Sequence, residues 1–414
     1  MVHRLMRACI NTATGSNGLR KKRVMTASKT TVLTERQNEI VGVFLENPDT
    51  ALSVGQLMKQ FDVDRSTLFR DLAVLSKLAI LKPDAPTRAR TYTLDRKSDA
   101  YLEWDLSRPK HARQPVSYDP RLLESYAPNR TFLLTQAQRE QLAKAGTLAS
   151  TPSGARLAKA GKTYQRILAT LLIDLSYASS NLEGVPISWL DTKTLLEFGE
   201  KPKGLNDLQM RIVLNHKQAI NFVAEHAKDM TMSRRDLLDI HSLLTKDLIQ
   251  DRSAIGDLRQ RVVMIDDSQY TPPDNPHILR EAFEKLCQKA SKIKDPFEQA
   301  FFIMAFLPYL QPFQDGNKRV SRLAMNVPLI KNHLAPFSFT DIAKRDYILG
   351  LLAFYERGRH EFLARAFVGA YAKTGPRYAK IVDFVGRGGI VTTITTTPPT
   401  ISTTVSRSTR RRKP

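Results

Sequence analysis

The sequence predicts a mainly α-helical protein in which a small winged helix-turn-helix module precedes a larger helical core with one short β-hairpin. Three observations lead to this fold class. Apolar residues recur at helical spacing along most of the chain, turn signals separate three short helices near the N-terminus, and β-branched runs are few. With 414 residues, 42% of them hydrophobic, the chain is long enough for two to three domains.

Much of the formal net charge of +22 lies near the two ends of the chain. No acidic residue precedes Glu35, and the chain closes on Arg410, Arg411, Arg412 and Lys413. We expect residues 1–30 to be a basic, disordered N-terminus and residues 386–414 a disordered, Thr-rich basic tail, because neither segment can bury enough apolar surface to fold alone. The first 30 residues superficially resemble a transit peptide, and a true start at Met25 explains them equally well.

Cysteine usage and hydropathy indicate the compartment. Cys9 and Cys287 show no spacing typical of a metal site or a disulfide framework, which favours a reducing, cytoplasmic environment. The most apolar run, Phe301 to Leu310, is about half of the roughly 20 residues that a membrane-spanning helix needs. We therefore expect no membrane span.

Residues 31–95 show the pattern of helix starts and turns that is typical of a helix-turn-helix. Helices are predicted to begin near Thr34, at Ser53, which can cap the second helix, and near Arg65 after a turn. The third helix is shaped to enter a major groove with the outer face of its N-terminal end. The side chains expected to contact DNA there are Arg65, Ser66, Thr67 and Arg70.

Two strands of a wing are predicted after the third helix, at residues 80–82 and 90–94. The segment 66–75 resembles the recognition helix of bacterial DeoR-type winged-helix regulators, and this resemblance implies DNA as a partner. The residues also leave open a dimerisation or substrate-docking module with a solvated basic face, and a homodimer falls within that alternative.

Beyond the module, residues 96–160 are predicted to form a linker with short helices, because Pro109, Pro115, Pro120 and Pro128 interrupt the helical pattern. A strongly apolar helix, 161–182, follows and stops at Glu183-Gly184. Helices then dominate to about Tyr371. One strand-turn-strand is predicted near residues 262–270, and its first strand consists of Val262, Val263, Met264 and Ile265.

The most informative segment runs from Leu310 to Leu323, between two apolar helical stretches. A helix that begins near Asn317, after a glycine-containing turn, offers free backbone N–H groups and a positive dipole end, which together favour phosphate. Asp315 supplies a hard oxygen ligand for Mg²⁺ held against phosphate oxygens. Further donors come from Lys318, Arg319 and Arg322, so the predicted guest is a nucleotide di- or triphosphate.

The run from Gln311 to Arg322 resembles the signature of the Fic (fido) family, His-x-Phe-x-Asp/Glu-Gly-Asn-Gly/Lys-Arg-x-x-Arg, at every position but one. The resemblance covers residues 161–375 and implies a Fic-type helical core with a small β-hairpin flap, and ATP and Mg²⁺ as ligands. It implies Asp315 as the metal ligand. The nucleotide-binding residues that it implies are Gly316, Asn317, Lys318, Arg319 and Arg322.

The one departure from the signature is Gln311, which stands where the family histidine takes a proton from the target hydroxyl. An amide has no useful basicity, and a positioned general base typically contributes about 10²–10⁴-fold. AMP transfer is therefore expected to be slow or conditional. His241 and His277 are the candidates for a relocated base.

A second family element lies upstream of the signature. Residues 179–184 fit the inhibitory pattern Ser/Thr-x-x-x-Glu-Gly/Asn that many Fic proteins carry on an extra helix, with Ser179 and Glu183 at its fixed positions. The resemblance implies that Glu183 forms a charge-assisted pair with Arg322 and so occupies a group that the γ-phosphate needs. An inhibitory element would have nothing to restrain in a fully inactive protein, so its presence argues against complete loss of activity.

Three functions follow from these features. The preferred one is ATP-dependent AMP transfer to a hydroxyl of a protein target, the chain itself included, with the strand 262–265 holding an extended target segment. The alternative is a non-catalytic Fic protein that binds DNA as a transcriptional regulator. Lys318 resembles the Doc branch of the family, and that likeness keeps phosphate transfer open.

Overall fold

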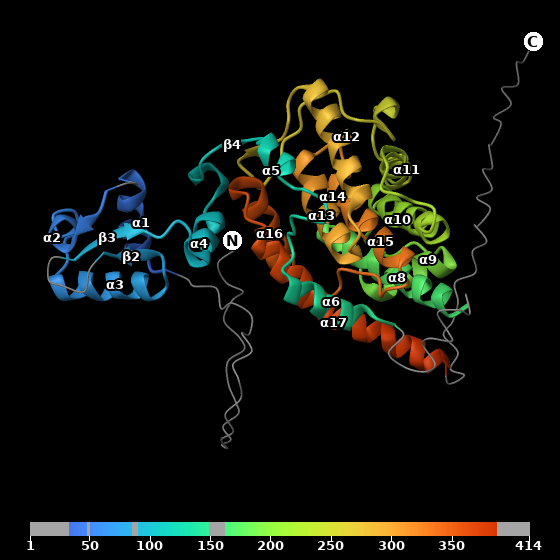
Figure 1. Cartoon of the computed structure of the whole chain (residues 1–414), viewed down its shortest axis with the longest axis horizontal. Coiled ribbons are helices and arrows are strands. Elements are labelled where there is room, and N and C mark those ends of the chain that lie inside the picture. The colour runs from blue at the N-terminus through green and yellow to red at the C-terminus, as the bar shows by residue number, and fades with distance from the viewer. Residues whose placement is uncertain (1–32, 48–49, 85–89, 149–161, 387–414) are drawn as a thin grey trace, which may run out of the picture. The chain divides into compact units, whose positions relative to one another are not determined.

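The computed structural model describes residues 33–47, 50–84, 90–148 and 162–386 (Figure 1). The chain separates into two compact units, Met1–Tyr101 and Leu102–Pro414. The two predicted disordered ends, apart from Gly386, and the alternative start at Met25 lie outside the described residues.

The first unit combines three helices with a small antiparallel sheet. Thr34, Ser53 and Asp64 each accept a hydrogen bond from a backbone N–H of the first helical turn that follows, so each helix starts where its cap predicts. The helices are α1 (Glu35–Glu46), α2 (Val54–Leu57) and α3 (Arg65–Lys77). The strands, in the order β1-β3-β2, are β1 (Leu52–Ser53), β2 (Leu81–Pro83) and β3 (Thr91–Leu94).

The core of this unit is built from the apolar faces that the helical spacing predicts. Leu68, Leu72 and Leu75 of α3 are fully buried together with Ile40 and Leu57. The elements follow one another in the order that a winged helix-turn-helix requires, and membership of that class of domain stays a prediction.

Residues 102–148 differ from the expected linker, because they are packed into the second unit. The buried carboxylate of Glu298 accepts hydrogen bonds from the backbone amides of Leu133 and Leu134 and from the Tyr126 hydroxyl. Pro109 and Pro120 stand at the start of short helices, and Leu123 and Leu142 of this segment are buried. These elements are α4 (Asp99–Ser107), η1 (Lys110–Ala112), β4 (Val116–Ser117), α5 (Pro120–Glu124) and α6 (Gln136–Gly146).

The remainder of the second unit is helical around α13 (Pro296–Leu310), whose residues are almost all buried. In Figure 1 this helix lies among the others, and it packs on α6, α12, α14, α15, α16 and α17. The other elements are α8 (Lys162–Leu182), α9 (Trp189–Phe198), α10 (Asp207–His226), α11 (Arg234–Thr245), η2 (Arg252–Ala254), α12 (Pro276–Lys292), α14 (Asn317–Ala324), α15 (Asn326–Lys331), α16 (Lys344–Arg357) and α17 (Glu361–Gly386). A mainly helical core with small sheets is thus the fold class that the sequence predicts.

The predicted β-hairpin at 262–270 is wrong in its first strand. Residues 262–265 form no strand, and the only strand in this segment is β5 (Tyr270–Thr271), which pairs in parallel with β4. The β-branched run has no neighbouring strand within hydrogen-bonding reach, and a strand without a partner is not stabilised. The run is instead an open loop, with the side chains of Val262 and Met264 more than half exposed.

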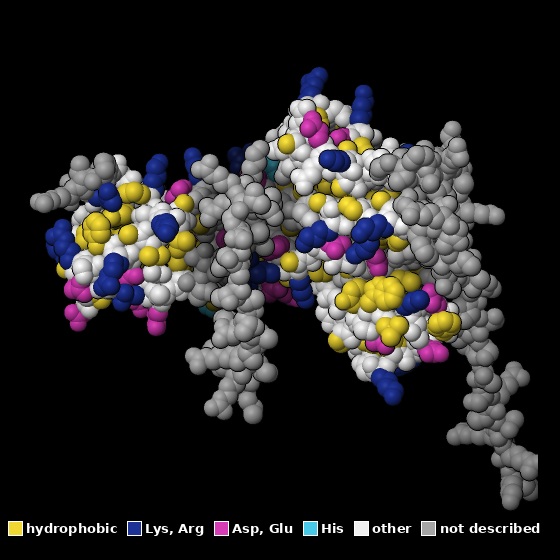
Figure 2. Space-filling view, turned by 90° about the horizontal axis from the view of Figure 1, so that it is seen from below, with side chains coloured by type: hydrophobic (Ala, Val, Ile, Leu, Met, Phe, Trp, Pro, Cys, Tyr) yellow, Lys and Arg dark blue, Asp and Glu magenta, His cyan; other side chains and the backbone are white. Residues whose placement is uncertain are grey.

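The surface of the second unit mixes apolar and charged side chains. Figure 2 shows apolar side chains lying between Lys and Arg side chains on the face seen there. Leu190 and Phe198 of α9 are among the most exposed large apolar side chains. Among the described helices, none is both long and apolar enough to cross a membrane.

Candidate functional site

The loop that joins α13 to α14 is held in one conformation by two residues in the left-handed region. Gln311 ends α13 with φ +46°, and Gly316 precedes α14 with φ +81°. A β-carbon at Gly316 would lie 2.9 Å from a methyl carbon of Thr245 and would be strained at this φ. Only glycine fits there, which places the first amides of α14 against the loop.

Two side chains fasten this loop to the core. Phe313 is fully buried and stacks on the ring of His241, with ring centroids 4.0 Å apart. Asn317 closes the loop from the helix side, because its Oδ1 accepts from the Phe313 amide at 2.9 Å and its Nδ2 donates to the Phe313 carbonyl at 2.8 Å. These contacts tie the loop to the core at Phe313 and to the start of α14 at Asn317.

The loop borders a cavity of about 430 Å³ within the second unit. Asp315, Asn317, Lys318 and Arg322 line one side of it, so the sequence-predicted phosphate and metal residues do converge. Gln311 and Gly316 of the same loop also line it. Further lining residues come from the turn that follows α8 (Glu183, Gly184), from the open loop (Val263, Met264, Ile265) and from α16 (Lys344, Tyr347, Tyr355).

Arg319 does not line the cavity, although the sequence predicts it to bind phosphate. Its guanidinium is buried, with Nη1 donating to the Leu244 carbonyl at 3.1 Å and Nη2 pairing with Oδ2 of Asp315 at 2.7 Å. Because the Asp315 side chain is 59% exposed, that carboxylate can still exchange this partner for another cation.

Glu183 and Arg322 form an ion pair at the edge of the cavity, with Oε1 2.5 Å from Nη2. Burial alone would raise the pKa of Glu183, but the positive charges of Arg322 and Lys318 outweigh it and lower the pKa to about 2. The carboxylate is therefore ionised at every working pH. Arg322 is fully buried, and its Nη1 has no hydrogen-bond partner within the described part of the chain.

Ser179 connects this pair to α10 through a histidine that the sequence did not single out as functional. Its Oγ accepts from Nε of Arg322 at 2.9 Å and lies 2.9 Å from Nε2 of His216, whose Nδ1 lies 2.8 Å from the Ile212 carbonyl. Since a carbonyl only accepts, Nδ1 carries the proton and Ser179 donates to Nε2. Burial and the neighbouring Arg319 lower the pKa of His216 to about 3, which keeps the ring neutral.

The helix that carries Glu183 is also anchored along its length. Asp174 of α8 accepts a hydrogen bond from the indole Nε1 of Trp189 at 2.8 Å, and it lies 3.3 Å from Arg377 of α17. Burial raises the pKa of Asp174. The position of Glu183 is thus set by contacts of α8 with α9, α10 and α17 rather than by the ion pair alone.

Gln311 has both polar atoms of its side chain engaged inside the loop. Nε2 donates to the Pro308 carbonyl at 2.7 Å, and Oε1 accepts from Nδ2 of Asn317 at 2.9 Å. The amide therefore stabilises the loop and accepts no proton from a ligand. The backbone carbonyl of Gln311 accepts a hydrogen bond from Nε of Arg259, a buried arginine that the sequence did not single out as a site residue.

Neither histidine considered as a relocated base lines the cavity. The ring of His241 is used twice, since Nδ1 accepts from the Gly256 amide at 3.0 Å and Nε2 lies 3.1 Å from the Asp315 carbonyl. Burial lowers its pKa to about 4. His277 lies exposed in the first turn of α12. Among the described cavity-lining residues there is no histidine at all.

The residues expected to read DNA form a separate cluster at the start of α3, in the first unit. Asp64 accepts from the hydroxyls of Ser66 and Thr67, and Nη2 of Arg70 donates to the Thr67 hydroxyl at 2.8 Å. Arg65 is exposed beside them. Over the described residues between 33 and 101, acidic and basic side chains are equal in number, so this part of the chain has no net positive charge.

Comparison with known proteins agrees with this geometry. Residues 231–329 match the Fic/DOC family, and the chain therefore contains a Fic/DOC domain. It is 26% identical over 176 residues to a protein adenylyltransferase Fic of Nematostella vectensis, which covers 41% of this chain and 40% of the relative. With the protein adenylyltransferase Fic of Aedes aegypti it shares 26% identity over 163 residues, 39% of this chain and 32% of the relative. The matched region thus spans well under half of these relatives.

Among solved structures, a Fic family protein from Desulfovibrio desulfuricans G20 aligns over 64% of this chain and 79% of its own length, with 20% sequence identity and a TM-score of 0.47.

Proposed function

We propose that this chain is an ATP-binding Fic protein that transfers AMP to a hydroxyl group of a protein target and that Glu183 restrains it. The observation that carries the proposal is the ion pair of Glu183 with Arg322 at a cavity lined by the loop of the Fic signature. Nε of Arg322 donates to Ser179 and Nη2 pairs with Glu183, whereas Nη1 is a buried donor without a partner in the described residues. Once Glu183 leaves, an anion such as a terminal phosphate can accept from both Nη1 and Nη2.

The lining residues fit a triphosphate. The first amides of α14 have no side-chain cap, because its N-cap is Gly316, so they are free to donate to phosphate oxygens. Lys318 adds a positive charge on the same side. Asp315 would hold Mg²⁺, which would neutralise charge on the phosphates, in exchange for its contact with Arg319.

The reaction requires an oxygen of the target hydroxyl to bond to the α-phosphorus while pyrophosphate leaves and the hydroxyl proton is lost. Gln311 cannot take that proton because its amide is engaged with Pro308 and Asn317. We therefore expect turnover to be lower by about 10²–10⁴-fold than with a positioned base. Binding and orientation of ATP do not depend on this residue.

The open loop 262–265 supports a protein target. No backbone group of Val262, Val263 or Met264 has a hydrogen-bond partner among the described residues, and the loop borders the cavity. An extended target segment can pair with these free groups as an added strand. The chain itself is one such target.

Incubation with ATP labelled separately at the α- and γ-phosphates tests the proposal. Label from the α-phosphate on protein is the expected result after Glu183→Gly, which frees Arg322. Label from the γ-phosphate would instead favour the phosphate transfer that Lys318 leaves open. ATP binding without any label would favour the non-catalytic regulator.

A further inference from the structure

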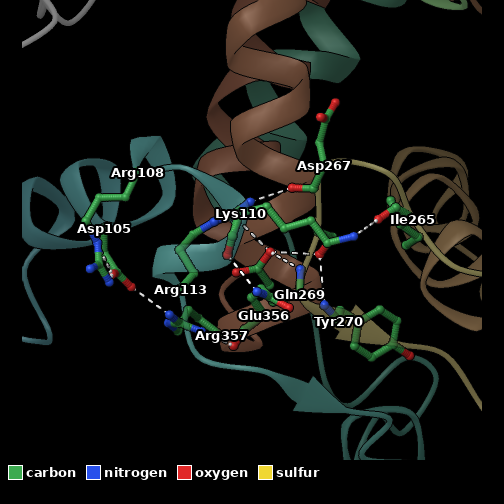
Figure 3. A network of polar contacts seen from close by, with 11 residues as sticks. Asp105, Arg108, Lys110, Arg113, Ile265, Asp267, Gln269, Tyr270, Glu356 and Arg357 are labelled. Atoms are coloured by element: carbon green, nitrogen blue, oxygen red, sulfur yellow. Dashed lines mark hydrogen bonds and ion pairs between the residues drawn. The ribbon is translucent and has the colours of Figure 1, made fainter.

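A segment that precedes the helical core lies beside the open loop. Side chains of this segment donate hydrogen bonds to carbonyl groups of the loop and of the residues that follow it. We define the strap as residues 110–117, which comprise η1 and β4. Nζ of Lys110 donates to the Ile265 carbonyl at 3.2 Å, and Nη2 of Arg113 donates to the Asp267 carbonyl at 2.5 Å (Figure 3). One hydrogen bond runs in the other direction: Nε2 of Gln269, which follows the loop, donates to the Lys110 carbonyl at 2.7 Å.

A buried ion pair fixes the strap to α16. The side chains of Arg113 and Glu356 are 3% and 0% exposed, and Nη1 lies 2.7 Å from Oε1. The same oxygen accepts from the Ser268 hydroxyl and from the Gln269 amide, so a single carboxylate gathers the strap, the loop and α16. Figure 3 shows these groups pointing toward one another.

Arg113 and Glu356 do not form the two-bond contact that is the strongest geometry for such a pair, because one arm of the guanidinium binds the backbone beside the loop. Nη1 and Nη2 of one guanidinium can together bind both oxygens of a carboxylate, yet Oε2 of Glu356 is buried without a partner in the described residues. Nη2 donates to the Asp267 carbonyl instead. A pair that served only packing would gain by engaging both carboxylate oxygens, so the observed geometry favours a role in placing the loop.

We infer that the strap holds the loop 262–267 in the position where a target strand pairs with it, with Arg113 as the positioning residue and Lys110 as its assistant. That a target strand pairs with the loop rests on the proposed function, whereas the contacts that hold the loop do not depend on that function. The backbone of Val262–Met264 forms no hydrogen bond within the described part of the chain, so its position depends on the contacts at Ile265 and Asp267. At the other end of the loop, Arg259 donates to the Arg261 carbonyl at 2.9 Å.

Two substitutions separate the strap from general stability. Lys110→Met removes one donor to the loop, keeps the apolar stem and leaves no buried charge behind. Arg113→Lys keeps a cation beside Glu356 but lacks the planar fork that serves the carboxylate and the Asp267 carbonyl together. Lys201→Met is the matched control, because Lys201 pairs with Asp207 at an exposed site and does not line the cavity.

The first measurement is amide hydrogen exchange of the full chain over residues 268–270, directly after the loop, where the Ser268 amide donates to the Ile265 carbonyl and the Gln269 amide donates to Glu356. Both strap variants should exchange faster there by about two- to tenfold, the ratio expected for one net hydrogen bond, while the control matches the wild type. Equal exchange in wild type and both strap variants would overturn the inference, whatever their activity.

The second measurement uses the Glu183→Gly background and α-labelled ATP, with the chain itself as acceptor. The strap variants should raise the half-saturating acceptor concentration, with ATP binding by calorimetry unchanged. A fall in ATP binding equal to the loss of labelling would show a general structural defect and would also overturn the inference. If Glu183→Gly itself incorporates no label, the proposed transfer fails, and hydrogen exchange alone then decides the role of the strap.

Discussion

At the scale of single residues, Gln311 and Glu183 stand at two successive requirements of the proposed reaction. Glu183 occupies one arm of Arg322, which the terminal phosphate needs, and Gln311 offers no proton acceptor. The first acts on how ATP binds and the second on the chemical step. Their effects should therefore combine in a way that neither shows alone.

We predict that Glu183→Gly alone tightens ATP binding or reveals slow α-label incorporation, and that Gln311→His alone changes little. The double variant should label strongly, by up to about 10²–10⁴-fold over Glu183→Gly, because it adds a base to a productively bound nucleotide. Incorporation of α-labelled ATP into the chain or a cell lysate is the readout. A double variant that binds ATP yet takes up no label would favour the non-catalytic regulator.

The ion pair also predicts how the restraint depends on pH. Because the pKa of Glu183 is lowered to about 2, the pair is formed above the ordinary carboxyl range and is lost only as pH falls toward 2. The ratio of ATP affinity between Glu183→Gly and wild type should thus stay constant from about pH 5 to about pH 8, within about twofold. Calorimetry at several pH values measures it, and a ratio that collapses at the acidic end of this range would show that the pair titrates there.

At the scale of elements, the sequence identifies the signature loop and the helix with Glu183 because both depend on short-range rules. Gly316 is needed by the backbone itself, and Glu183 ends a strongly apolar helix. His216 and Arg259 could not be singled out in this way, since their partners lie on helices and loops distant in sequence. A buried histidine facing Ser179 has no local pattern that marks it.

For the open loop, in contrast, the local sequence pattern predicts a structure that does not form. Val262–Ile265 has the composition of a strand, but composition does not supply a neighbouring strand, and the chain instead pairs Tyr270–Thr271 with Val116–Ser117. Within the linker predicted at 96–160, residues 102–148 form short elements that are packed against the core. Prolines mark the ends of its short elements, and the burial of Leu123 and Leu142 against the core is a tertiary property.

For α3, we predict salt-sensitive binding of duplex DNA that depends on Arg65 and Arg70. Changing both to glutamate should lower the slope of log affinity against log salt by about 1 for each phosphate that these side chains no longer neutralise. Fluorescence anisotropy of a labelled duplex over a salt series is the measurement. Deletion of residues 1–30 and 387–414 is the necessary comparison, because the described part of residues 33–101 has no net charge. Binding that survives the arginine changes and disappears with the ends would place the affinity there.

At the scale of the whole molecule, two buried neutral histidines make folding stability depend on pH. Burial lowers the pKa of His216 to about 3 and that of His241 to about 4, both below the ordinary value of 6.5. The unfolded chain therefore binds more protons in mildly acidic solution. The contribution of these rings to stability is complete above pH 6.5 and is lost as pH falls toward 4 and 3.

We predict that the free energy of unfolding drops between about pH 7.5 and about pH 5 by on the order of 1–2 kcal/mol for each histidine. Denaturant titrations at the two pH values measure the drop. His216→Gln removes one of the two titrations and should flatten the dependence, whereas substitution of the exposed His277 should leave it unchanged. A wild-type stability that does not vary between these pH values would contradict the assignment of neutral, buried rings.

The hydrogen bond between Trp189 and Asp174 gives the molecule an optical reporter of its own. Trp189 and Trp104 are its two tryptophans, and the indole of Trp189 donates to Asp174 of α8, the helix that Glu183 directly follows. Trp104→Phe would leave a single emitter beside that helix. If ATP displaces Glu183 and shifts α8, the emission of Trp189 changes in intensity or wavelength as its N–H loses the carboxylate. The contact between Glu183 and Arg322 could then be followed in real time, without a label and without turnover.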